Sequence, residues 1–347
     1  MNARGFTLVE WLIAMLIGVF LIGGGLSVFV ASRATTEDAF DQSELQENGR
    51  IAMRLLTQDL KWAGFWGDYT GSPMVVGLGV TVDAKPSANN CLNNSGQEGS
   101  LPSSVGANRS LWVVRINASK AIVGGAFSCI PVSERIAGTD VISVKRLIGH
   151  ALPSLSTAAD LIKNDDNKYY MATTTQAAHI FPIDEARGDK SIPVDINDEK
   201  MPNRQFWVYQ HFLYYISPND KTGNPELKKR FLTPNGGSVV IGGAMAEGIE
   251  KISVLFGVDD SPVPDGVIDR YVATSNVTEQ EWSEGRVVAA RIFILVRSLQ
   301  ASGSYVNNNV YQVGDVPVFG NGDGYRRLLL ESSVSLRNPT VIAGGGK

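Results

Sequence analysis

The sequence has few of the residues that build catalytic and metal centres. Its 347 residues include two cysteines and three histidines, and the histidines are far apart in the chain (His150, His179 and His211). The patterns HExxH, CxxC and GxSxG are absent, which leaves zinc-protease, dithiol and serine-hydrolase chemistry without a motif. We therefore do not expect an enzyme, and a membrane-anchored enzyme with a site assembled from distant residues is the least favoured alternative.

Charge is also scarce. Charged residues make up 19% of the chain, the net charge is −4, and no basic block occurs. Because proteins that bind nucleic acid present clustered Lys and Arg, nucleic acid is not an expected partner. Apolar residues make up 44% of the chain. The length is enough for a membrane helix followed by one large or two small globular units.

One long apolar run lies close to the N-terminus. Residues 11–31 carry no charge, and a helix of these 21 residues is about 30 Å long, enough to cross a bilayer. A secretory signal peptide has a shorter apolar region and no use for an acid such as Glu10 at its start. Glu10 has no evident partner on its own helix, and an unpartnered acid in a membrane segment indicates a function. A plain N-terminal anchor is the alternative.

Residues 5–10 read Gly-Phe-Thr-Leu-Val-Glu and follow a short leader that contains Arg4. This N-terminus resembles that of type IV prepilins. The resemblance implies that a prepilin peptidase cuts between Gly5 and Phe6 and methylates the new amine of Phe6. It also implies that Glu10 neutralises the terminal amine of a neighbouring subunit. A cation and an anion at matching depth in lipid relieve each other's desolvation, so such a pair selects the axial register.

The first helix is expected to continue beyond the membrane. Residues 35–63 lack proline, and their apolar residues recur at spacings of three to five, which is typical of an amphipathic helix. Gly49 is the internal breaker, at a cost of about 1 kcal/mol relative to Ala, and Gly64 and Gly67 end the helix. The chain is thus expected to consist of a cleaved leader (1–5), a transmembrane half-helix (6–31), an amphipathic half-helix (32–64) and a β-rich globular domain (65–347).

The globular part is predicted to be largely β-structure. Segments rich in Val, Ile, Phe and Tyr and bounded by turn residues predict strands at 111–116, 141–148, 206–216, 238–241, 251–258, 287–297 and 328–336. Residues 71–110 are rich in Gly, Ser, Asn and Pro and predict loop, whereas residues 151–200 have no clear pattern. The expected fold is pilin-like and of the α+β class, with the long N-terminal helix packed on an antiparallel sheet.

Further segments resemble one branch of the pilin superfamily, the PilW-type minor pilins. They are Leu-Gln-Glu-Asn-Gly-Arg at 45–50, Asp-Leu-Lys-Trp-Ala-Gly-Phe at 59–65, and parts of 248–271, 288–298 and 325–338. That family often has a cysteine shortly after the Ala-Gly-aromatic element, where this chain has Asp68. The family's disulfide pairing is therefore not carried over.

The resemblance implies a structural subunit that primes type IV pilus assembly at the filament tip. Its partners would be other minor pilins, the major pilin, the prepilin peptidase and the inner-membrane assembly machinery. The helix would anchor the protein in the bacterial inner membrane with the globular domain in the periplasm, before transfer to the pilus tip. Two alternatives stay open: a minor pseudopilin of a type II secretion system, and a tip adhesin with a ligand site in residues 70–200.

Two cysteines and an aromatic-rich segment give further predictions for the globular part. If that part is exported, Cys91 and Cys129 form one disulfide, closing a loop of about 40 residues and stabilising the fold by about 3 to 4 kcal/mol. Two buried free thiols are the alternative. The aromatic-rich segment 206–215 is interpreted as a core strand whose alternate face is half buried, with a contact face for another subunit as the alternative.

No cofactor is expected, and calcium is the alternative. The candidate ligands are the carboxylates of one acidic segment, Asp259, Asp260, Asp265 and Asp269. Apolar residues at 263 and 264 stand where a regular calcium loop has oxygens, so a solvated acidic turn between strands is preferred. Residues 164–167, Asn-Asp-Asp-Asn, form a weaker candidate. The glycine-rich segment 320–324 does not join a strand to a helix, which favours a hairpin turn over a phosphate loop.

Overall fold

The computed structural model describes a large part of the chain. The described residues are 7–70, 73–83, 91–92, 97–122, 127–153, 161–162, 167–182, 201–234, 237–240 and 243–338. Gly5, Phe6 and the acidic residues Asp165 and Asp166 lie outside them. The expectations about the leader, the cleavage site and the second acidic segment therefore stay predictions.

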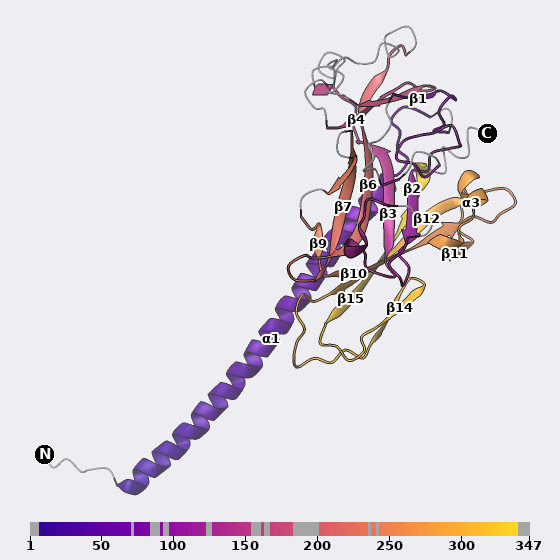
Figure 1. Ribbon diagram of the computed structural model, residues 1–347. Coiled ribbons are helices and arrows are strands. Elements are labelled where there is room, and N and C mark those ends of the chain that lie inside the picture. Colours follow the sequence, from indigo (N-terminus) through magenta and orange to yellow (C-terminus); the bar gives the residue numbers. More distant parts are fainter. Residues whose placement is uncertain are drawn as a thin grey trace.

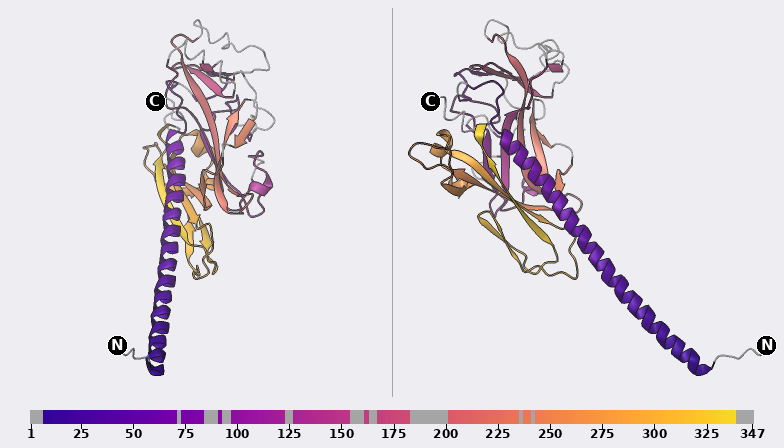
Figure 2. Two further views of the ribbon diagram at one scale, coloured as in Figure 1. Left: turned by 90° about the vertical axis from the view of Figure 1, so that its left-hand side faces the viewer. Right: turned by 180° about the vertical axis from the view of Figure 1, so that it is seen from behind.

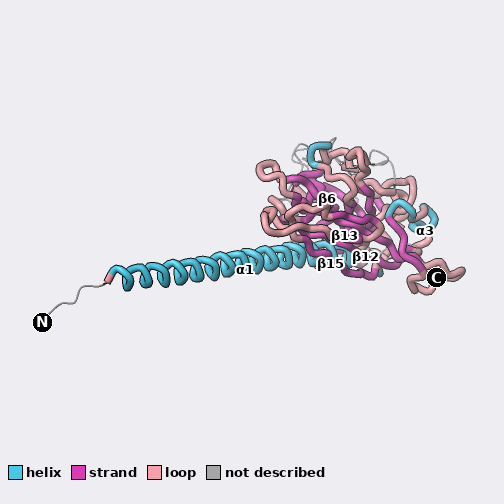
Figure 3. Tube along the Cα trace, turned by 90° about the horizontal axis from the view of Figure 1, so that it is seen from below, coloured by secondary structure: helices cyan, strands magenta, loops and turns pink. Residues whose placement is uncertain are grey.

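A single unbroken helix, α1 (Leu8–Trp62), begins the described chain and confirms the expected continuous N-terminal helix. Figures 1 and 3 show its first half projecting away from the head and its second half lying along the head. The helix ends at Trp62 with Ala63 as its C-cap, and Gly64 and Gly67 then adopt positive φ values of 73° and 67°. These left-handed conformations favour glycine, which explains the predicted stop.

Within the described residues, the larger sheet has nine strands, and it forms one layer of the head. Its main order is β1-β5-β4-β6-β3-β2, and β7 extends it by pairing with β6, β8 and β9. All pairings are antiparallel except that of β1 with β5. The strands are β1 (Val80–Val82), β2 (Leu111–Arg115), β3 (Asp140–Leu147), β4 (Tyr169–Thr173), β5 (Ala178–Pro182), β6 (Gln205–Pro218), β7 (Pro225–Thr233), β8 (Gly237–Val240) and β9 (Ala246–Glu247).

The second sheet has four antiparallel strands in the order β11-β10-β12-β15. A separate hairpin of β13 and β14 follows β12 in the chain. The bounds are β10 (Ile249–Val258), β11 (Arg270–Ala273), β12 (Val287–Arg297), β13 (Val310–Val313), β14 (Val316–Phe319) and β15 (Arg327–Ser335). Short helical pieces are η2 (Val132–Glu134), η5 (Thr274–Asn276) and α3 (Glu279–Ser283). The architecture confirms the predicted pilin-like α+β class.

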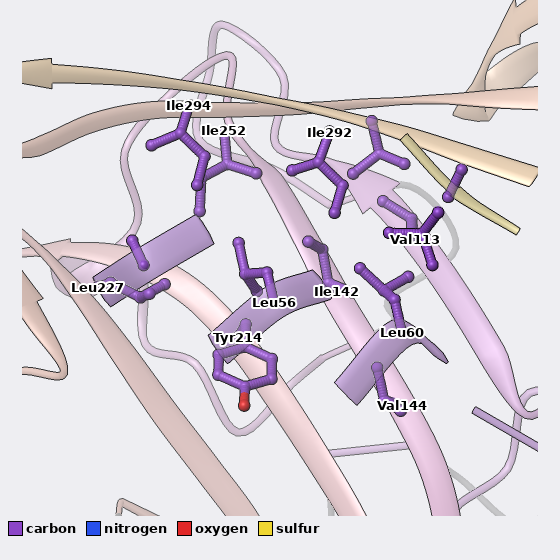
Figure 4. Packing of buried hydrophobic residues seen from close by; sticks show 14 of the residues in the cluster. Leu56, Leu60, Val113, Ile142, Val144, Tyr214, Leu227, Ile252, Ile292 and Ile294 are labelled. Atoms are coloured by element: carbon purple, nitrogen blue, oxygen red, sulfur yellow. The ribbon is translucent and has the colours of Figure 1, made fainter. Parts of the chain in front are cut away.

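The main core lies where α1 meets both sheets. Buried residues of α1, including Leu56 and Leu60, belong to one cluster with residues of β2, β3, β6, β10, β12 and β15. Figure 4 shows these two leucines beside Ile142 and Val144 of β3, with isoleucines of β10 and β12 across from them. The helix therefore joins the sheets and is part of the domain's core.

Gly49 has a packing role that the sequence did not reveal. A Cβ atom added there would overlap Leu330 Cδ1 of β15 and would lie 3.0 Å from Val296 Cγ2 of β12. The glycine allows the helix to approach the four-stranded sheet closely. Its lower helix propensity is therefore offset by a contact that no larger residue permits at this spacing.

Two local predictions need correction. The aromatic segment 206–215 is a core strand, as preferred, but its alternate face is half buried only at Val208 and Gln210. The other residues of that face are buried, and they are Phe206, Phe212 and Tyr214. The segment 320–324 forms a turn after β14, yet β14 and β15 do not pair. The hairpin turn lies earlier, between β13 and β14, where Gly314 has a φ of 64°.

Candidate functional site: the helix N-terminus and its junction with the head

Glu10 sits in the first turn of α1 and has a partner on its own helix, which corrects the expectation from sequence. Its Oε2 accepts hydrogen bonds from the Thr7 N–H at 2.9 Å and from the Thr7 hydroxyl at 2.8 Å. The Thr7 hydroxyl oxygen in turn accepts from the Glu10 N–H at 3.3 Å. This reciprocal capping box fixes the helix start. The sequence pattern of this capping box is Thr-x-x-Glu ahead of an apolar run, and it is present at residues 7–10.

The helix beyond Glu10 presents apolar side chains on every face. Its large apolar residues from Leu8 to Val30 are all exposed, with Phe20 74% exposed. Within the described chain, α1 is the helix that is long and apolar enough to cross a membrane. A helix that is apolar all round needs an apolar environment, such as lipid or neighbouring helices.

Asp59 anchors the other end of α1 to the nine-stranded sheet. The side chain of Asp59 is 8% exposed. Its Oδ1 accepts from Arg146 Nη2 of β3 at 2.9 Å, and its Oδ2 accepts from Lys229 Nζ of β7 at 2.9 Å and from the Tyr214 hydroxyl of β6. Burial acts to raise the pKa of Asp59, but Lys229, the Tyr214 hydroxyl and Arg146 together outweigh it and hold the pKa below its ordinary value.

This ionic cluster was missed at the level of sequence. Asp59 lies on the apolar stripe of the amphipathic helix, three residues after Leu56 and next to Leu60, both fully buried. A lone acid on such a stripe indicates an ionic or hydrogen-bonded site, because a buried carboxylate requires cations or hydrogen-bond donors as partners. The partners come from three strands that are far away in sequence, so they were not predictable.

A second buried polar network links β3 to the segment before β2. Lys145 Nζ donates to the Glu98 carbonyl at 2.9 Å and to Asn108 Oδ1 at 3.0 Å. Burial lowers the pKa of Lys145 to about 7, against the opposing effect of Glu98. Arg109 nearby is ion-paired with Glu98 at 2.9 Å and with Glu279 of α3.

This network borders a small cavity in the region considered for a ligand. The cavity has a volume of about 120 Å³ and is lined by Trp66, Trp282 and residues 73–74, 97 and 107–111, with Ser283. Ligand sites for small molecules usually measure about 300 to 1,000 Å³. The cavity is below that size, and the alternative of a ligand site in residues 70–200 stays untested.

The two cysteines are joined, as predicted. Cys91 and Cys129 form a disulfide, with their Cα atoms 4.6 Å apart. Cys91 is buried in a cluster with Phe127, Tyr215 and other apolar residues. The bridge therefore holds Cys91 against the face of the large sheet opposite the helix.

The acidic segment between β10 and β11 uses its carboxylates within the turn. Asp259 accepts from the backbone N–H groups of Ser261, Asp265 and Gly266 at 3.0, 2.8 and 2.7 Å. Burial opposes the shift, but these three donors lower the pKa of Asp259. Asp260 is ion-paired with Arg270. Among the residues that the structure describes, no group of three or more His, Cys, Asp or Glu is arranged to hold a metal ion. The calcium alternative stays untested.

The site and fold define a class of protein: an α+β head carried on a long helix whose first half is suited to a membrane or to a bundle of helices. Comparisons of the sequence with known protein families specify this class further. The family described as "Prokaryotic N-terminal methylation motif" matches residues 1–26, and the family described as "Type IV Pilus-assembly protein W" matches residues 213–338. Together with the fold, these matches support a type IV pilus-associated pilin with a prepilin-type N-terminus.

One curated relative agrees with this. "Pilin-like protein PilA3" of Thermus thermophilus is 40% identical over 65 residues, which cover 18% of this chain and 28% of that protein. No solved structure matches the chain. The likeness to the relative is thus confined to a short stretch, and the head is characterised by its own fold and by the family match over residues 213–338.

Proposed function

We propose that this protein is a minor pilin that is cut between Gly5 and Phe6 and helps to prime type IV pilus assembly at the filament tip. The observation that carries the proposal is the exposed apolar half of α1 with a single acid, Glu10, at its start. The prepilin-type match over residues 1–26 supports processing at that start. The role is structural, because the family matches point to a structural protein.

Glu10 is the residue that we assign to subunit registration. Both donors from Thr7 reach Oε2, and among the described residues no hydrogen bond reaches Oε1. This free oxygen is suited to accept from the N-methylated amine of Phe6 on a neighbouring subunit. In a low-dielectric helix bundle such a pair is favourable only at matching depth, so it fixes the axial position of the entering subunit.

The proposed location follows from the same features. Arg4 and the leader stay in the cytoplasm, α1 crosses the inner membrane, and the head lies in the periplasm before incorporation at the pilus tip. The disulfide fits an oxidising compartment. The partners would be sister minor pilins, the major pilin, the prepilin peptidase and the inner-membrane assembly machinery.

The test is the mass of the native N-terminus in cells with and without prepilin peptidase. We expect a peptide that begins with N-methylated Phe6 and disappears when the peptidase is absent. An intact Met1, or a cut near Ala31, would overturn the proposal.

A second measurement follows the incorporation of the protein into pili. Glu10→Gln is expected to be processed normally yet to be lost from sheared pili. The control Glu47→Gln, at an exposed position, is expected to be incorporated normally.

A further inference from the structure

Strand β15 forms one edge of the four-stranded sheet, and its pairing register tells which backbone groups point outward. Among the residues that the structure describes, the order β11-β10-β12-β15 places β12 on one side of β15 and no strand on the other. The Ser298 N–H donates to the Arg326 carbonyl at 2.9 Å and the Leu336 N–H donates to the Val288 carbonyl at 2.8 Å. In an antiparallel ladder such bonded pairs recur every second residue. Even-numbered residues of β15 therefore face β12, and odd-numbered residues direct their backbone N–H and C=O groups to the open edge.

The open edge has no hydrogen-bond partner within the described chain. No backbone or side-chain group there bonds to the outward backbone groups of these residues, which are Arg327, Leu329, Glu331, Ser333 and Ser335. An unpaired row of this kind is a ready template for another strand.

The usual protections of an edge strand are missing from β15. It contains no proline and no lysine, and it runs without a bulge through nine paired positions. Its one acid, Glu331, is neutralised by Arg291 of β12, whose Nε donates to it at 2.8 Å. Natural sheets usually block such edges with charge, proline or a bulge, so an open edge of this length indicates that it is used.

The side chains along this edge are also incompletely covered. Leu328, Leu329 and Leu330 are consecutive, and all three are only partly buried. Leu328 and Leu330 pack toward the core beneath α1, whereas Leu329 packs on the opposite face with Phe293 and Leu295. A strand added at the edge would cover both faces of this leucine triplet. Figures 1 and 2 show β15 beside α1 at the side of the head.

We propose that the β15 edge accepts an extended strand from a different subunit of the pilus assembly. The inference rests on the proposed function. The partner strand carries apolar residues beside Leu328–Leu330 and small or hydroxyl residues beside the serines at 332, 333 and 335, because these match the side chains on the edge. A second copy paired antiparallel through β15 would reverse the direction of its own α1, which prevents both helices from sharing one membrane orientation.

Amide hydrogen exchange on the full chain tests this directly, with residue-level fragmentation over β15. The chain alone in detergent micelles is compared with the chain in filaments sheared from cells. We expect the amides of Leu329, Glu331 and Ser333 to exchange rapidly in micelles and to become protected in filaments, whereas those of Leu330 and Ser332 are protected in both. Odd-numbered amides that stay unprotected in filaments would overturn the strand proposal while leaving the pilin proposal intact.

Two variants separate backbone pairing from side-chain effects. Ser333→Pro removes one outward N–H at an edge position that tolerates proline, and Ser333→Thr keeps the N–H. We expect both variants to keep the melting temperature and Phe6 processing, and only the proline variant to be lost from sheared filaments. Equal incorporation of both variants would refute the proposal. Truncation after Asn338 tests the chain's own C-terminal residues: odd-numbered amides protected in micelles and released by truncation would also refute it.

Discussion

Replacing Asp59 should be among the most damaging single changes in the head, because it removes the carboxylate that pairs with two buried cations. Arg146 and Lys229 have side chains 15% and 14% exposed, and both bond the same carboxylate. Lys229 Nζ also lies 3.6 Å from the centre of the Phe212 ring, so water has little access to it. In Asp59→Ala both cations keep their burial and lose their counter-charge.

The expected cost is about 3 to 5 kcal/mol of unfolding free energy, the range found when one partner of a buried ion pair is removed. Asp59→Asn should cost less, because the amide oxygen still accepts one hydrogen bond. The matched control is Glu47→Ala on the same helix, whose ion pair with Arg50 is exposed and worth less than about 0.5 kcal/mol. Denaturant unfolding of the full chain in detergent, followed by tryptophan fluorescence, measures all three variants.

A cost below about 1 kcal/mol for Asp59→Ala would refute this reasoning, since it would mean that the two cations reach solvent without the carboxylate.

Limited proteolysis tests the contact between the end of α1 and the nine-stranded sheet separately. Loosening of the helix end should expose residues 55–63 to limited proteolysis in Asp59→Ala before the rest of the head is cut. Uniform cleavage of the head would instead assign the loss to general destabilisation.

Four further predictions concern other parts of the fold. Gly49→Leu should destabilise the helix–sheet contact by about 1 to 3 kcal/mol in the same assay, because the added side chain overlaps the sheet. The unfolding free energy should rise with pH from about 7 towards 10, since the folded chain releases the Lys145 proton there while the unfolded chain keeps it, and Lys145→Met should flatten this slope. Reduction of the Cys91–Cys129 disulfide should cost about 3 to 4 kcal/mol, read as a lower denaturation midpoint. Calcium at about 1 mM should leave the melting temperature unchanged, because the oxygens of Asp259 already accept backbone N–H groups.

Local sequence patterns predicted the long helix and the strands with dense β-branched or aromatic residues. The predicted segment 287–297 coincides with β12, and 111–116 and 206–216 overlap β2 and β6. These elements carry their own signal because their period and composition are local. Strand β7 was missed because its centre reads Lys-Lys-Arg, and these cations face Asp59, Glu134 and Glu226 rather than an apolar core.

The residues of the candidate site also differ in whether a local sequence pattern identifies them. Glu10 could be identified from sequence because its significance depends on an apolar run beside it, and the Thr7 capping box depends on a spacing of three residues. Asp59 and Lys145 could not be assigned, since each depends on partners from distant strands.

The open edge of β15 depends on topology, and this is why no local pattern indicates it. Three consecutive leucines followed by glutamate and two serines read as an ordinary strand, and a central strand could have the same sequence. The sequence becomes informative only when the sheet order leaves β15 last and the ladder to β12 fixes which residues point outward. A pilin head needs a way to select neighbours beyond the helix bundle, because apolar helix packing is weakly specific. Backbone pairing at one defined edge supplies that selection, since a shift by one residue turns every partner side chain to the wrong face.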